Sequence, residues 1–501
     1  MAYLFGAGDA VDAFNVAFRI PNLVRDLFAE GAMSAAFVPT FTRTLARDGS
    51  SAAWRLGNHV VNALLVVTAA LVLAAIVFAH PLVMLLAGDY AAVPGKLELT
   101  VLLTRTMLPF LILTATAAAA MGMLNSFDRY FVPALAPAVF NVCSILTTLA
   151  FIPVLARFGL PPILSMAIGV VAGGLGQVAI QWPALGREGY RYMPVLDPRE
   201  PGLRNVLILM GPGTLGLAAT QVNVFVNTWL ATGQGTGAVS WLNYAFRLMY
   251  LPLGLFGVSI ATAAIPSIAR RAAADDLSGL GRTVSSGVAM MLALTVPATL
   301  GLMVLARPIV ALLFERGHFT PADTAATAGA LVCYAVGLSG YSIVKVATPT
   351  FYALGQSRIP VVVSACTVMA NVGLNLAFVR QFGYRGLALG TSISALANAG
   401  LLLYLLERRL GGLRLAHMAS VIIRMLVAGA VMAVVAWGVE HELALALPGH
   451  GLLRQVARVG GAIGVGLAVL MAGARLLGVT EFTGVIAAVW RRLWGPGGTA
   501  L

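Results

Sequence analysis

The segment FNVAFRIPNLVRDLFAEGAMSAAFVPTF, residues 14–41, has the apolar character of a membrane helix but contains charged side chains. Arg19, Arg25 and Glu30 lie within it, and Pro21 also stands inside it. An ionisable side chain at bilayer depth costs at least about 2.5–3.5 kcal/mol on insertion scales, so it usually faces a partner or a water-filled cavity. The segment therefore predicts a helix that lines a hydrated cavity suited to an anion.

The composition of the whole chain predicts a membrane protein. Of its 501 residues, 59% are hydrophobic and only 10% are charged, against about 25% charged in soluble domains. Further apolar runs follow the opening segment, each near the roughly 20 residues that a helix needs to cross a bilayer. They cover about 60–86, 98–122, 131–155, 162–183, 204–231, 237–268, 285–314, 326–354, 359–379, 386–406, 418–440 and 454–478. Because lipid offers the backbone no hydrogen-bond partner, we expect an all-α polytopic fold of about thirteen spans.

Arginines gather in alternate connections between these runs, for example in residues 43–55, 187–204 and 408–414. The positive-inside rule predicts that these connections are cytoplasmic. The residues before the first run would then lie outside with no segment to carry them there, so we expect a further helix upstream. The same distribution accounts for most of the formal charge of +13. We therefore expect no nucleic-acid partner.

The chain also repeats itself. The pair Phe18-Arg19 recurs as Phe246-Arg247, and Arg129 recurs as Arg358, at offsets between 227 and 229 that two proline pairs share. Two similar halves are typical of secondary transporters whose substrate site lies between them. The predicted domains are an N-lobe with a truncated first helix (1–190), a C-lobe (200–410), a C-terminal helix pair (415–480) and a cytoplasmic tail (481–501).

Arg25 and Arg247 are the strongest candidates for binding an anion. Each lies in the first helix pair of its half and near a proline, and guanidinium groups bind phosphate oxygens through paired hydrogen bonds. Arg19 and Lys345 are further candidates for the cavity, with a structural ion pair as the alternative for each. The sequence contains no GxxxxGK[ST] loop and no histidine spacing typical of a metal site. We expect no enzyme activity, no metal and no cofactor.

Several long stretches resemble the MurJ/MviN family of lipid II flippases, which belongs to the MOP transporter superfamily. The most specific are FGAGDAVDAFNVAFRIPNLVRDLFAEGAMSAAFVP at 5–39, SWLNYAFRLMYLPLGLFGVSIATAAIPSIAR at 240–270 and YAVGLSGYSIVKVATPTFYALGQSRIP at 334–360. The resemblance implies two six-helix lobes in an inverted-V, MATE-like arrangement, followed by two C-terminal helices. It also implies a multi-pass protein of the bacterial inner membrane.

The implied function is that of a flippase in peptidoglycan synthesis and cell-wall biogenesis. It would turn lipid II, the undecaprenyl-pyrophosphate-linked precursor, from the inner to the outer leaflet by alternating access. Lipid II, membrane lipids and cell-wall synthesis proteins are the implied partners. The motifs of the family place its substrate-binding positions on Arg25, Arg247, Asp12 and Ser240, and its FAEGA glutamate on Glu30.

The sequence departs from the family at two points and leaves other readings open. The family's first helix, with its arginine motif, is absent, and Phe246 stands where many relatives have a polar residue. A related exporter of another lipid-linked saccharide or a drug is one alternative, and a non-transporting scaffold for cell-wall synthesis is another. The sequence does not decide between a coupling ion and the membrane potential as the source of energy.

Overall fold

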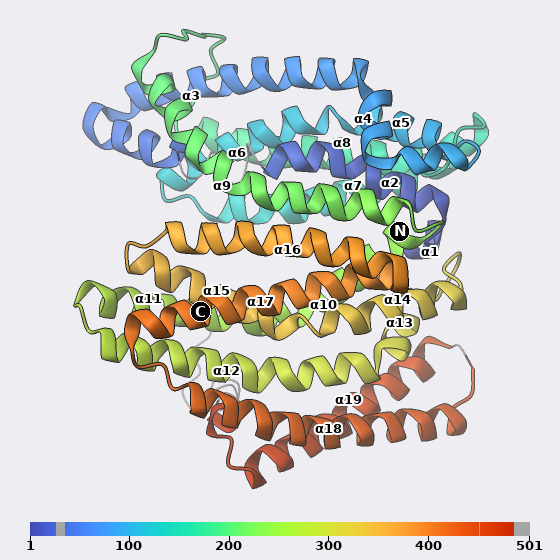
Figure 1. Ribbon diagram of the computed structural model, residues 1–501. Helices are drawn as coiled ribbons and strands as arrows, with labels where there is room; N and C mark the ends of the chain where they lie inside the picture. The colour runs from blue at the N-terminus through green and yellow to red at the C-terminus, as the bar shows by residue number, and fades with distance from the viewer. Residues whose placement is uncertain (27–35, 450, 485–501) are drawn as a thin grey trace. The chain divides into compact units, whose positions relative to one another are not determined.

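The computed structural model of the protein describes residues 1–26, 36–449 and 451–484, with the backbone path alone for 211–220 (Figure 1). These residues form helices and connecting turns, with no β-strand among them. Their contacts divide the chain into two compact units. We call Gly8–Val239 the N-terminal unit, and Ser240–Leu501 together with Met1–Ala7 the C-terminal unit.

The N-terminal unit is built from the apolar runs predicted for the first part of the chain. Its elements are α2 (Asp9–Arg25), α3 (Val38–Val77), α4 (Ala79–Ala87), the short 3-10 helix η2 (Gly88–Ala92), α5 (Lys96–Met107), α6 (Phe110–Ser126), α7 (Phe131–Arg157), α8 (Leu164–Arg187) and α9 (Pro201–Thr232). α7 packs along α8, and α2 packs against α5. The second of these contacts positions the charged residues of α2.

The C-terminal unit contains the remaining helices. They are α1 (Ala2–Phe5), α10 (Ala238–Pro252), the π-helical turn η3 (Leu253–Val258), α11 (Ser259–Ala273), α12 (Leu277–Val304), α13 (Ala306–Phe314), α14 (Pro321–Ala335), α15 (Leu338–Ala353), α16 (Arg358–Phe382), α17 (Tyr384–Leu410), α18 (Leu415–Ala446) and α19 (Leu452–Leu476). α18 packs against both α12 and α19, and α13 also contacts α19. Figure 1 shows α18 and α19 running side by side.

The prediction of an all-α polytopic membrane protein is confirmed. Ten helices of the described residues are long and apolar enough to cross a membrane, or eleven if α14 and α15, which meet at a bend of 42°, form one span. The sequence predicted about thirteen. The difference has two sources, because α2 has only 17 residues and only Pro201–Met210 of α9 could be assessed.

The boundary between the two units lies at a different point in the sequence from the predicted boundary between the lobes. The sequence placed residues 200–410, and with them α9, in the C-lobe, whereas α9 belongs by its contacts to the N-terminal unit. The predicted lobes were defined by an internal repeat and the units by packing, so the two divisions measure different properties. The lobe boundaries at 1–190, 200–410, 415–480 and 481–501 remain predictions.

A polar strap ties the connection between α8 and α9 to the side of α3. Asn58 accepts hydrogen bonds from the Tyr190 hydroxyl at 2.8 Å and from the Met193 N–H at 3.0 Å. Asn62 donates to the carbonyls of Met193 at 2.7 Å and Val195 at 3.0 Å. Both asparagine side chains are buried, so these bonds satisfy polar groups that would otherwise be costly to bury. The strap thus fixes a long connection that has no secondary structure of its own.

Asp276 forms the N-cap of α12, just outside the apolar span. Its carboxylate accepts a hydrogen bond from the backbone N–H of Gly279 at 2.8 Å and pairs with Arg271 Nη1 at 2.8 Å. The bond from Gly279, followed by those from Ser278 and Arg271, holds the pKa of Asp276 below its usual value. A carboxyl group with a lowered folded-state pKa stabilises the fold above its unfolded pKa, which is about 3.9. That contribution is lost as the pH falls through the folded-state pKa.

We therefore expect the first turn of α12 to lose protection from hydrogen exchange as the pH falls below about 4. In the Asp276→Asn variant, the protection of the same amides should change little over this range, because asparagine caps helices about as well as aspartate but does not titrate. Exchange rates corrected for intrinsic chemistry would test this. An equal loss of protection in both proteins would show that Asp276 is not the titrating group.

Candidate functional site

The charged end of α2 holds Arg25, the residue that the sequence placed first among its candidates. The Arg25 side chain binds the neighbouring carboxylate through both Nε and Nη2, which lie 3.1 and 2.8 Å from Asp26 Oδ1. Gln221 of α9 donates to the other oxygen of Asp26 at 3.4 Å. The Arg25 and Asp26 side chains are 30% and 33% exposed. Arg25 is therefore a partly exposed cation whose guanidinium is bound by a carboxylate in this conformation.

The helix that carries Arg25 continues through its proline. α2 extends from Asp9 to Arg25 with Pro21 inside it, and the helical winding widens to a π-type turn at Asp26. Arg19 and Arg25 are six residues apart, which on an ideal helix separates their directions by roughly 120°. The proline therefore does not bring the two arginines to one face within α2.

Asp12 lies in a buried cluster of charges at the opposite end of α2. Lys96 Nζ is 3.1 Å from Asp12 Oδ2 and 2.7 Å from Asp9 Oδ1. The backbone N–H of Gly237 donates to Asp12 at 2.7 Å, and the Lys96 ammonium lies 4.1 Å from the centre of the Tyr90 ring. Asp12 is fully buried and the Lys96 side chain is 2% exposed. The cluster joins α2, η2, the start of α5 and the turn after α9.

The position of this cluster bears on the predicted role of Asp12. Thirteen residues of helix separate Asp12 from Arg25, a rise of about 20 Å. Direct contact between these two side chains is therefore excluded in this conformation. Asp12 and Arg25 can therefore serve one substrate only if the substrate spans this distance or α2 moves, and the substrate-binding role that the resemblance implies for Asp12 remains a prediction.

In the C-terminal unit, α10 presents Ser240 and Arg247 on one face, since seven residues correspond to about two helical turns. Ser240 is fully buried and Arg247 is exposed. The Phe246 ring packs against Tyr334 with ring centres 5.4 Å apart. A π-helical turn follows at Leu253–Val258. Such turns are frequent at functional sites, and this one directly follows Pro252 at the end of α10.

The remaining predicted residues fall in different parts of the chain. Lys345 is exposed on α15, and Arg19 is partly buried on α2. Glu30 lies outside the described residues. Arg25, Arg19 and Asp12 belong to the N-terminal unit, whereas Arg247, Ser240 and Lys345 belong to the C-terminal unit. The roles assigned to all of these residues, and a cavity shared by Arg25 and Arg247, remain predictions.

Sequence reasoning missed Lys96, although it is the centre of a buried ionic cluster with Asp9 and Asp12. Its partner Asp12 is 84 residues away in the chain, so no local pattern connects them. One signal was available, because Lys96 and Lys345 are the only lysines in a chain with 32 basic residues. The rarity of lysine, together with the position of Lys96 between two apolar runs, is the signal that points to this residue.

Comparison with models of known protein families identifies the family to which this fold and these motifs belong. A family model described as "Lipid II flippase MurJ" matches residues 1–453. The chain belongs to the MurJ family. The family resemblance inferred from the sequence is therefore confirmed, and so is the assignment to a multi-pass protein of the bacterial inner membrane.

Curated relatives of this MurJ family member agree with the assignment. The probable lipid II flippase MurJ of Vibrio cholerae is 34% identical over 489 residues, which cover 96% of this chain and 92% of the relative. The protein of the same name from Rhizobium meliloti is 35% identical over 86% of this chain and 81% of its own. The matches therefore include both units.

Two solved structures share the fold. One is "Lipid II flippase MurJ, inward closed conformation", with a TM-score of 0.76, 23% identity and coverage of 95% of both chains. The other is an inward-facing multidrug resistance MATE family transporter of the MOP superfamily, with a TM-score of 0.71, 16% identity and coverage of 82% of this chain and 92% of that chain. The predicted likeness to MOP transporters is confirmed at the level of the fold.

Proposed function

We propose that this protein moves lipid II from the inner to the outer leaflet of the bacterial inner membrane by alternating access. The observation that supports this most strongly is the match of residues 1–453 to the family of lipid II flippases. Relatives named as lipid II flippases cover most of the chain at 30–35% identity. The helical, apolar architecture fits a transporter, and we propose no catalytic step.

The physical problem in this function is the charged head group. A pyrophosphate-linked saccharide cannot enter hydrocarbon without losing its hydration, and the cost of one buried charge is already several kcal/mol. A polyprenyl tail has no such cost and can remain in lipid. The protein therefore needs to supply a wet, cationic compartment for the head group while leaving the tail outside.

Arg25 is the described residue best suited to such a compartment in the N-terminal unit. Its side chain is 30% exposed, and its guanidinium already holds a carboxylate oxygen through two N–H groups. A pyrophosphate offers the same type of acceptor with greater charge, so it can replace Asp26 as the partner. We assign Arg247, with its exposed guanidinium on α10, the corresponding role in the C-terminal unit. Ser240, Asp12, Arg19, Lys345 and Glu30 are proposed as supporting positions.

The energy source belongs to the same proposal. Moving one charge through the membrane potential is worth about 2.3 kcal/mol per 100 mV, and a coupling ion is the alternative. The described residues contain no cluster of three or more metal-ligating side chains. We propose no bound cofactor, and we propose cell-wall synthesis proteins and membrane lipids as further partners.

Complementation tests the proposal. A bacterium depleted of its lipid II flippase should survive when it produces the full chain, and vesicles containing the purified chain should translocate a fluorescent lipid II analogue. An Arg129→Ala variant is the matched control, because Arg129 forms an exposed ion pair with Glu188 outside the apolar spans, and such pairs contribute little. If an inserted chain moves other lipid-linked saccharides but not lipid II, the related-exporter alternative is favoured. Rescue without any translocation would favour the scaffold.

A further inference from the structure

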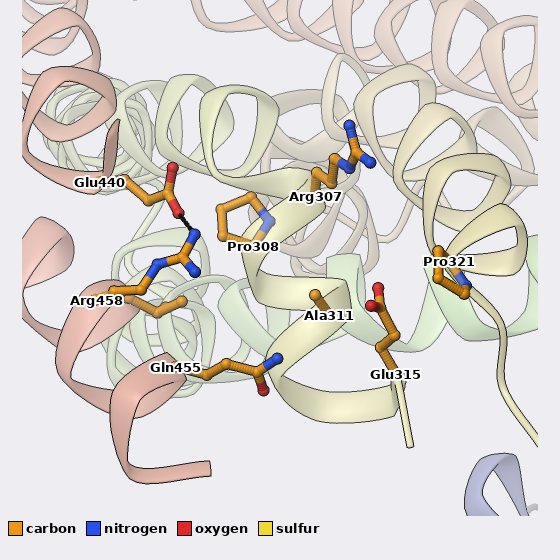
Figure 2. Close-up of a pocket in the computed structure, with 9 residues that line it drawn as sticks. Arg307, Pro308, Ala311, Glu315, Pro321, Glu440, Gln455 and Arg458 are labelled. Carbon is orange, nitrogen blue, oxygen red and sulfur yellow. Dashed lines mark hydrogen bonds and ion pairs between the residues drawn. The ribbon is translucent and has the colours of Figure 1, made fainter. Parts of the chain in front are cut away.

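A pocket of about 390 Å³ lies where α13, α18 and α19 meet in the C-terminal unit. Figure 2 shows its polar lining, to which α13 contributes Arg307 and α19 contributes Gln455 and Arg458. Glu440 comes from α18, and Glu315 follows the end of α13. The volume is within the range of small-molecule sites. None of these residues belongs to the proposed flippase site.

Two atoms in this lining lack hydrogen-bond partners within the described part of the chain. Gln455 is 7% exposed, and its Oε1 atom is buried without a donor. Arg458 donates from Nη2 to Glu440 Oε1 at 2.6 Å, but its buried Nε has no acceptor. Leaving a buried polar atom unpaired costs about 1–3 kcal/mol. The pocket therefore favours a ligand that brings both an acceptor for Arg458 and a donor for Gln455.

The charges of the lining restrict the ligand further. Arg458 and Glu440 form a mostly buried pair, with side chains 23% and 16% exposed. Arg307 and Glu315 add one charge of each sign at the pocket's edge. The pocket thus has no net charge, and a simple anion would gain little from it. A zwitterion, with a phosphate for the guanidinium groups and an ammonium for the carboxylates and the Gln455 oxygen, matches both signs.

An apolar recess of about 230 Å³ is lined by Val304, Ala433, Val434 and Trp437. Trp437 precedes Glu440 by three residues on α18, a rise of about 4.5 Å, so the recess begins roughly one turn from the polar pocket. Val434 and Trp437 are 68% and 58% exposed on a helix apolar enough to span a membrane. A polar pocket adjoining a lipid-facing apolar recess is suited to an amphiphile.

The expected orientation of the chain places this site at the outer leaflet. α18 begins just after the arginine-rich connection at 408–414, which the positive-inside rule makes cytoplasmic. The polar pocket lies near the other end of α18, at Glu440. Tryptophan is also enriched at the membrane interface, which agrees with Trp437 standing between recess and pocket.

We propose that this pocket binds the head group of an aminophospholipid from the outer leaflet, with an acyl chain lying against the apolar recess. The phosphate oxygens accept from Arg458 Nε and Arg307, and the primary ammonium donates to Gln455 Oε1 and the carboxylates. Such a lipid would fill the junction between α13 and the C-terminal helix pair. The proposal does not depend on lipid II being the transported molecule.

The test measures lipid retention on the purified full chain by native mass spectrometry. The probes are dioleoyl phosphatidylethanolamine, the phosphatidylcholine with the same acyl chains, and the corresponding phosphatidylglycerol. We expect phosphatidylethanolamine to be retained about tenfold better than either, because only its head group has both a phosphate and N–H donors. Equal retention of the three lipids, or a preference for phosphatidylglycerol, would overturn the proposal.

Amino-acid substitutions test whether the preference for phosphatidylethanolamine arises in the pocket. Gln455→Leu and Arg307→Gln should each remove most of the preference for phosphatidylethanolamine. Gln181→Leu is the matched control, because Gln181 is also buried with an unpartnered Oε1 but lies on α8. Unchanged retention in both pocket variants would overturn the assignment. If Gln455→Leu does not fold, the variant at the exposed Arg307 and the comparison of the three lipids on the unaltered protein still test the proposal.

A soluble analogue of the head group tests whether the acyl chain contributes to binding. Free phosphoethanolamine at the concentration of the lipid should not displace phosphatidylethanolamine, because it cannot occupy the apolar recess. Displacement at equal concentration would show that the recess contributes nothing and would contradict the lipid as occupant.

Discussion

Replacement of Arg25 by alanine should reduce lipid II translocation about 30-fold or more. Removing one partner of a buried, hydrogen-bonded charge pair costs about 2–5 kcal/mol. The lower end applies here because the Arg25 side chain is 30% exposed and its interactions are partly screened by solvent. A loss of 2 kcal/mol corresponds to roughly 30-fold. Initial rates with a fluorescent lipid II analogue in vesicles would measure this. Arg25→Lys should retain part of the activity, since it keeps the charge but loses the planar fork.

The contact between Arg25 and Asp26 makes a structural role testable separately. If Arg25 only neutralises Asp26, then the double variant Arg25→Ala/Asp26→Ala should recover activity, because no unpaired carboxylate remains. If Arg25 binds the pyrophosphate, the double variant should stay as inactive as Arg25→Ala. Recovery in the double variant would therefore contradict the assignment of Arg25 as a substrate-binding residue. The Arg129→Ala protein should behave as the unaltered chain in the same assay.

Replacement of Lys96 by methionine should give the largest loss of stability, about 3–5 kcal/mol. Asp12 is fully buried and would lose its ammonium partner, whereas Asp9, at 43% exposed, would remain solvated. Thermal unfolding in detergent would measure the loss. The control is Lys345→Met, because the only other lysine is exposed; its effect should lie within about 0.5 kcal/mol.

Replacing Asp12 by asparagine, its neutral isostere, tests whether the buried charge of Asp12 causes this loss of stability. In the double variant Lys96→Met/Asp12→Asn, most of the stability should return, because no buried charge is left unpaired and the amide oxygen can still accept from Gly237. Two single variants whose losses add in the double variant would show that the two side chains act independently. That result would contradict a coupled ion pair.

Much of the fold could be predicted from the sequence because membrane helices are encoded locally. The predicted run 131–155 is close to α7 (Phe131–Arg157), and 418–440 lies within α18 (Leu415–Ala446). Breaks within runs were not predicted: α5 and α6 are separated at Leu108 and Pro109 inside the run 98–122. A run of apolar residues reports burial in lipid but not the point where the helix bends.

The candidate site could be predicted only in part, for a related reason. Arg25 stands out because a charge in an apolar helix is visible in one segment of sequence. The pairing of Lys96 with Asp12, and of Asn58 with Met193, depends on segments that meet only after folding. These contacts are specified by packing rather than by a local pattern, so reading one helix at a time cannot reveal them.

The strap on α3 also sets a mechanical limit on α9. The last anchored group is the N–H of Asp197, which donates to His59 Nδ1 at 3.2 Å, and α9 begins at Pro201. Four peptide steps span at most about 14 Å even when fully extended. While these hydrogen bonds hold, the first residue of α9 can move no farther from the anchor than the length of the connecting chain allows. Any larger movement of that end requires the Asp197–His59 bond to break first and then the asparagine bonds behind it, so these bonds together set the free-energy threshold for such a movement.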